Sequence, residues 1–254
     1  FTKSISSGAY LVPLLLALSG MITWTNPVWT LLGPIVAMIF LMFTGALLVW
    51  DLDHPERFWM VLTRPQWRSW LVRGGFIITA YGGILALHLG AVIGGRPEIP
   101  QSLAWLGGPL AAMTAIYTAY LFAQAKARDL WQSPLLPPHL LVQALLAGSA
   151  SLILLNPIEL GVGAIWTLQA SLAVHLMLAL GEVSMPHPTA HAALAARNMT
   201  KGAYAAFYWG GIVLTASALL LMSANVTIGA LAGLVGLFLH EHAYVQAGQS
   251  VPLA

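Results

Sequence analysis

The side chains in this sequence best suited to chemistry are polar residues that interrupt long apolar runs. His88 and His175 each lie deep in such a run, and Glu182 follows His175 by about two helical turns. Ionisable groups at membrane depth are costly and usually face a cavity, a pathway or a polar partner. These three residues are therefore candidates for a proton pathway. The structural alternative for each histidine is a neutral imidazole hydrogen-bonded between helices.

Two tyrosines, Tyr117 and Tyr120, lie near the end of another apolar run. Tyr and Trp commonly form belts at the membrane–water interface, and the ten tryptophans of this chain fit such a belt. The functional alternative is that a tyrosine hydroxyl donates a hydrogen bond to a quinone carbonyl in a mostly apolar pocket.

The spacing of the histidines also requires haem binding and metal binding to be considered. Two histidines on facing helices can ligate a b-type haem, and His88 with His175 could supply them, but no second pair accompanies them. His187 and His191 have i,i+4 spacing in a proline-containing loop, and His240–His242 lacks the His-Glu-x-x-His pattern of zinc proteases. We expect these last histidines to be interfacial, and we predict neither a haem nor a metal site.

The composition is that of an integral membrane protein without a soluble domain. Of 254 residues, 59% are hydrophobic and 7% are charged, against about a quarter charged in soluble domains. The net charge of +2 gives no indication of nucleic-acid binding. The sequence contains no cysteine, so this chain cannot ligate an iron–sulfur cluster by itself.

The apolar runs predict eight transmembrane helices, because they are continuous and do not alternate as barrel strands do. The expected ranges are Ile5–Thr23, Val28–Trp50, Trp70–Ile93, Leu103–Ala123, Leu140–Leu155, Val162–Leu180, Ala203–Met222 and Val226–Val245. Residues 73–85 and 201–213 resemble each other at a constant offset of 128. We therefore predict an all-α fold of two repeat-related four-helix bundles, residues 1–128 and 129–254.

Basic residues gather on one side of the predicted membrane domain. With eight spans, both ends share that side with nine Lys or Arg residues, whereas the other side has only Arg96. The positive-inside rule makes the charged side and both termini cytoplasmic. The competing interpretation is that the basic loops form a docking surface for a partner. The first residue is Phe1, and we expect the native N-terminus to lie upstream.

Charge is most concentrated in the segment Asp51–Arg73, which holds seven of the 18 formally charged residues. Its sequence Asp-Leu-x-x-Pro-x-Arg-Phe, at Asp51–Phe58, resembles the signature of the NrfD-like, or polysulfide-reductase-type, membrane subunits. Further stretches that resemble this family are Ser69–Phe76, Tyr117–Tyr120, Leu130–Pro137 and Tyr244–Leu253. Together they cover most of the chain in the order typical of the family.

This resemblance implies a haem-free subunit of two four-helix bundles that binds a quinone, menaquinone or ubiquinone, in a prokaryotic cytoplasmic membrane. It implies an iron–sulfur partner subunit and a catalytic subunit, often a molybdopterin enzyme, which would carry the catalytic residues for the other substrate. Tyr117 matches the family's quinone-contacting tyrosine, and the remaining contacts fall before Phe1. Ala119 departs from the glycine common in the family, which affects the expected pocket shape.

The residues therefore receive three sets of expected roles. Quinone binding is assigned to Tyr117 and Tyr120. The proton pathway is assigned to Asp51, Asp53, His54, His88, His175 and Glu182. Partner docking is assigned to Arg57, Arg64, Arg68 and Trp131. Two alternatives are a haem-b quinol oxidoreductase subunit and a secondary transporter built on an internal repeat. The parallel direction of the repeat disfavours the transporter.

Overall fold

The computed structural model describes residues 1–156 and 160–251, and in that part of the chain the regular structure is entirely helical. The long helices are α1 (Thr2–Leu18), α2 (Gly33–Trp50), α4 (Trp70–Ile93), α5 (Ile99–Ala123), α6 (Leu136–Leu155), α7 (Gly161–Ser184), α9 (Ala205–Ala224) and α10 (Val226–Ser250). The short elements are a π-helical turn (Val28–Leu32), 3₁₀ turns (Pro55–Arg57 and Asp129–Gln132), α3 (Met60–Thr63) and α8 (Ala190–Lys201).

A helix forms at each of the eight predicted places. Among the described residues, seven helices are long and apolar enough to cross a membrane, which makes this a multi-pass membrane protein. The eighth, α1, has 17 residues, fewer than the roughly 20 that a spanning helix needs. The count of eight spans is therefore not confirmed and stays a prediction.

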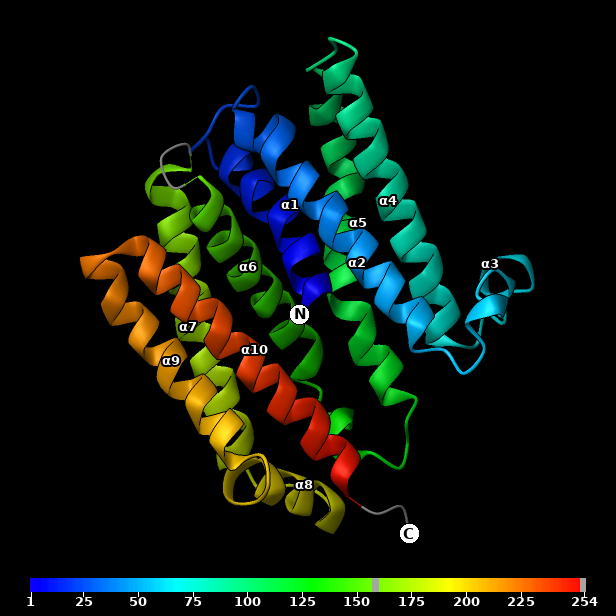
Figure 1. Ribbon diagram of the computed structural model, residues 1–254, viewed down its shortest axis with the longest axis vertical. Helices are drawn as coiled ribbons and strands as arrows, with labels where there is room; N and C mark the ends of the chain where they lie inside the picture. Colours follow the sequence, from blue (N-terminus) through cyan, green and yellow to red (C-terminus); the bar gives the residue numbers. More distant parts are fainter. Residues whose placement is uncertain (157–159, 252–254) are drawn as a thin grey trace.

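The helices gather into two groups that follow the order of the chain (Figure 1). Helices α1, α2, α4 and α5 pack together, as do α6, α7, α9 and α10. Helix α1 also packs along α6, and one hydrophobic cluster includes residues of both groups. The groups thus share a core. That they are related repeats, with a boundary at residue 128, stays a prediction.

The shared core depends on a contact between two glycines. A Cβ atom added to Gly148 of α6 would lie 2.1 Å from the carbonyl carbon of Gly8 in α1, and one added to Gly8 would lie 1.8 Å from the backbone oxygen of Ala144. Small residues let transmembrane helices approach this closely. Nearby, Ser6 donates a hydrogen bond to the Ala37 carbonyl of α2 (2.8 Å), so α1 is fixed on two sides.

We expect Gly148→Ala to destabilise the protein by about 1–3 kcal/mol, because α1 and α6 must separate to admit the methyl group. The matched control is Gly83→Ala, since no atom lies within 4 Å of a Cβ built on that exposed glycine of α4. Thermal unfolding in detergent measures both. Equal midpoints for the two variants would contradict the proposed role of the glycine contact.

Candidate functional site

Tyr117 of α5 lies between a cavity lined mostly by apolar residues and a second cavity that includes charged and polar groups. Its side chain is only 2% exposed, and the ring packs against Gly74 of α4. A Cβ atom on Gly74 would come within 2.3 Å of the ring carbon Cε2, so the tyrosine can occupy this position only beside a glycine. The pairing of Gly74 and Tyr117 therefore sets where the phenol lies.

Two cavities share Tyr117 in their walls. One, of about 380 Å³, lies between α2 and α4 and is lined mostly by apolar residues such as Leu48, Val49 and Ile78. The other, called the inner cavity below, has about 220 Å³. It is partly open, lies between α1, α2, α5, α6 and α10, and includes charged and polar groups. Apolar pockets with a few convergent polar groups are the usual form of small-molecule sites.

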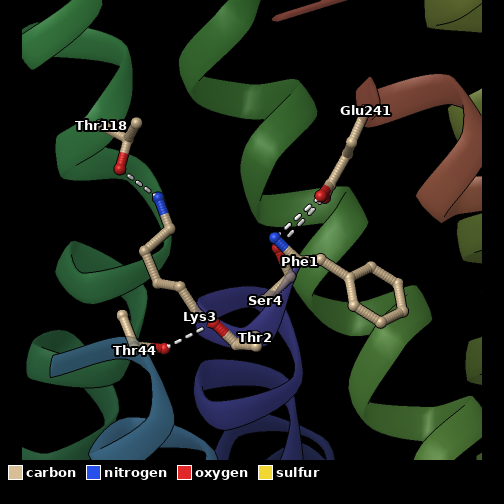
Figure 2. A network of polar contacts seen from close by, with 7 residues as sticks. All are labelled: Phe1, Thr2, Lys3, Ser4, Thr44, Thr118 and Glu241. Carbon is tan, nitrogen blue, oxygen red and sulfur yellow. Dashed lines mark hydrogen bonds and ion pairs between the residues drawn. The ribbon is translucent and has the colours of Figure 1, made fainter. Parts of the chain in front are cut away.

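The inner cavity is bordered by a polar network at the start of α1 (Figure 2). Lys3 donates a hydrogen bond to the Thr118 hydroxyl, and its ammonium lies 5.0 Å from the centroid of the Tyr117 ring. On the other side of α1, the Ser4 hydroxyl donates to Glu241 of α10 at 3.4 Å, and the nitrogen of Phe1 lies 2.8 Å from the same carboxylate. A buried cation and a carboxylate thus face one cavity.

Three buried histidines adjoin this cavity. His139 of α6 and His240 of α10 line it, and His175 of α7 lies against both. Nε2 of His139 and Nδ1 of His175 are 2.8 Å apart and share a hydrogen bond. Their exposed fractions are 3%, 0% and 1% for His139, His175 and His240. The set draws one imidazole from each of three helices.

Glu182 lies about two helical turns beyond His175 along α7. Its carboxylate accepts a hydrogen bond from the Tyr244 hydroxyl at 3.5 Å, and the same hydroxyl donates to the Leu130 carbonyl at 3.0 Å. Glu182 also lines a separate cavity of about 370 Å³ next to the loop that contains His187. This carboxylate therefore lies between the protein interior and the loops at that end.

The other interior residues predicted from sequence have different surroundings. Tyr120 is 36% exposed and its ring stacks on Trp70 at 4.5 Å, whereas Tyr117 is buried. The His88 ring is enclosed by Trp29 and Tyr10, at centroid distances of 4.9 and 5.7 Å. Because His88 and His175 have separate neighbours, they do not form the facing pair that a shared haem would require.

The charged segment after α2 lies outside the protein interior. Asp51, Asp53 and His54 are on the surface side of the fold, so the structure does not bring them together with the buried histidines. Gln124 at the end of α5 accepts from the backbone N–H of Trp70 (2.7 Å) and donates to the Arg68 carbonyl (2.9 Å). These bonds hold the end of the segment against the helical core.

Of the four residues assigned to partner docking, three are exposed and one is buried. Arg57, Arg64 and Arg68 are exposed. Trp131 is buried, stacks on Phe122 at 4.3 Å and packs on Gly248 of α10. Its ring is covered by this chain, and its assignment to a docking surface stays a prediction.

Sequence reasoning missed Lys3, His139 and Glu241, and it took His240 as interfacial. His139 was predicted to lie before the start of its helix. Instead, α6 begins at Leu136 and has prolines in its first turn. Proline is tolerated there because an N–H group in the first turn has no hydrogen-bond partner within the helix. That proline signal could have moved His139 into the helix. Lys3 could have been found as a lone cation inside an apolar helix.

The fold and the site define a multi-pass membrane protein whose helices enclose a hydrophobic core together with a group of buried polar side chains. The sequence matches the family model described as "Polysulphide reductase, NrfD" over residues 1–252, so the chain belongs to the NrfD family. This confirms the resemblance inferred from the motifs.

A relative from Halobacterium salinarum is assigned as a membrane component of a dimethyl sulfoxide reductase. It is 24% identical over an alignment of 193 residues, and the match covers 63% of this chain and 44% of the relative. The chain therefore spans less than half the length of that curated relative.

We expect Glu241→Gln to destabilise the protein by about 1–3 kcal/mol. The change weakens the Ser4 contact and removes the negative charge from the inner cavity, which Lys3 also lines. Lys3→Met should also destabilise, and the double variant should lose less than the sum of the two, with an interaction energy of about 0.5–3 kcal/mol. Glu98→Gln, at an exposed carboxylate, is the control. Additive losses in detergent unfolding would show that the two charges do not interact.

Proposed function

We propose that this chain is the quinone-reactive membrane subunit of a respiratory oxidoreductase complex. The observation that carries the proposal is the position of Tyr117 between a cavity lined by apolar residues and a polar inner cavity. A quinone has the matching shape and polarity, with an apolar tail and a headgroup with two carbonyl oxygens that accept hydrogen bonds.

In this proposal the quinone tail lies along the apolar cavity between α2 and α4, and the headgroup reaches Tyr117. The phenol donates a hydrogen bond to one carbonyl oxygen. The Lys3 ammonium, 5.0 Å from the ring centroid, stabilises negative charge on a reduced headgroup. Tyr120, which stacks on Trp70 away from both cavities, does not contact the reacting oxygens.

Oxidation of a quinol releases two electrons and two protons, and reduction of a quinone takes them up. The sequence contains no cysteine, so the electrons need a cluster on another chain. We propose an iron–sulfur partner subunit and, beyond it, a catalytic subunit such as a molybdopterin enzyme. The dimethyl sulfoxide reductase assignment of the Halobacterium relative supports this arrangement.

The protons need polar groups between the headgroup and water. We propose that Glu241 and the buried histidines beside the inner cavity take part, with Glu182 leading toward the loops. The predicted carriers Asp51, Asp53 and His54 serve at the surface. His88, enclosed by Tyr10 and Trp29, is the least connected of the predicted proton carriers. We further propose that the basic loops lie on the cytoplasmic side, following the positive-inside rule.

We expect Tyr117→Phe to weaken quinone binding about tenfold, the cost of one lost hydrogen bond of roughly 1.4 kcal/mol. Phenylalanine keeps the packing on Gly74 and the ring beneath Lys3, so assembly should be unchanged. Quinone titration by quenching of tryptophan fluorescence gives Kd, and turnover of the assembled complex at limiting quinol gives the functional effect. Tyr204→Phe, near the start of α9, is the control. Unchanged Kd and turnover in Tyr117→Phe would refute the quinone contact.

We expect the double charge reversal Arg64→Glu/Arg68→Glu to remove most of the partner subunits that co-purify with this chain. Both arginines are exposed in a segment whose end Gln124 holds against the core, so they present fixed charge to a partner. Arg96→Glu, in the exposed loop between α4 and α5 at the other end of the helices, is the matched control (Figure 1). Full retention of partners by the double variant would exclude this docking surface.

A further inference from the structure

The three buried histidines form a convergent group of metal-ligating atoms. His139, His175 and His240 come from α6, α7 and α10, and one ring nitrogen from each lies within 4.8 Å of the others. The ring centroids are 4.9, 5.5 and 4.7 Å apart for the pairs His139–His175, His139–His240 and His175–His240. Packing alone does not require three imidazoles to direct nitrogens at one point.

Hydrogen bonding within the described residues leaves part of this group unsatisfied. The bond between His139 and His175 uses one nitrogen of each ring. Nε2 of His175 and Nδ1 of His240 are buried and have no hydrogen-bond partner in the described part of the chain. A buried polar atom without a partner costs about 1–3 kcal/mol, so a ligand that engages these nitrogens would stabilise the group.

We propose that His139, His175 and His240 form a binding site for a borderline divalent transition-metal ion of the Zn²⁺ or Co²⁺ type. Neutral imidazole is a preferred ligand for such ions, at a metal–nitrogen distance of about 2.0–2.1 Å. Tetrahedral coordination at that distance separates ligand nitrogens by about 3.3 Å. The three ligand nitrogens now lie within 4.8 Å of one another, so ring movements that bring them closer would complete the site.

The inner cavity supplies a fourth ligand position and a path for the ion, which three histidines alone do not provide. His139 and His240 line this cavity of about 220 Å³, which has room for a water molecule as the fourth ligand and gives an ion a path to the site. Two carboxylates balance the charge of the ion, since Glu241 lines the same cavity and Glu182 is bonded to Tyr244 one turn from His240. The site is thus of the open, three-ligand kind. It shares no ligand with the proposed quinone site at Tyr117. With the ion bound, the three imidazoles are ligands and not proton carriers, so the proposed proton pathway then depends on Glu241 and Glu182.

The test uses the purified complex, or the full chain in detergent, stripped with a chelator and titrated with Co²⁺. We expect one Co²⁺ per chain, a visible ligand-field spectrum of tetrahedral type, and displacement by Zn²⁺. His175→Gln should abolish the spectrum and the stoichiometric binding. His88→Gln, which alters an equally buried histidine outside the group, should leave both unchanged. The partly exposed His191 is replaced in a further variant to detect binding at the loops.

Each outcome bears on the proposal. Absence of stoichiometric Co²⁺ in the native protein, or a spectrum that survives His175→Gln and disappears in His191→Gln, overturns it and leaves a hydrogen-bonded histidine group. If His175→Gln fails to fold, X-ray absorption at the zinc edge of the native Zn²⁺ protein counts the imidazole ligands. Three imidazoles support the site and fewer than three overturn it.

Discussion

The contact between Gly8 and Gly148 is the constraint on which the rest of this structure depends. It lets the backbones of α1 and α6 touch, and thereby joins the two groups of helices into one core. With larger residues the helices would separate, and the polar start of α1 would lose its partners on α5 and α10. The lipid environment provides no hydrophobic drive for such association, so close packing and hydrogen bonds must supply it.

Several polar groups in this interior have partners on another helix. Lys3 reaches Thr118, Ser4 reaches Glu241, and Tyr81 donates to the Ser6 carbonyl at 3.1 Å. Each contact links α1 to a different neighbour, so the hydrogen bonds repeat the connections that the glycine contact makes possible. The inner cavity lies among these groups because their charges cannot be enclosed by apolar packing alone.

The two proposed sites differ in the kind of ligand that each suits. At Tyr117 an apolar cavity ends against a phenol and an ammonium, which suits a molecule with an apolar tail and a polar head. At the histidines three neutral ligands meet beside water-sized space, which suits an ion. Because the two share the inner cavity, a charge change at one is felt at the other through a medium that screens it weakly.

The sequence by itself determined the class of protein, the family, and a helix at every expected place, because apolar runs and their breaking prolines and glycines are local signals. It also singled out Tyr117, His175 and Glu182, since polar residues in apolar runs stand out. Only the tertiary structure decided which polar residues meet. Lys3, His139, His240 and Glu241 gather from three helices, and Trp131 turns inward, through contacts between segments distant in the chain. Local patterns carry no information on such pairings, because the side chains that a helix presents inward depend on its neighbours.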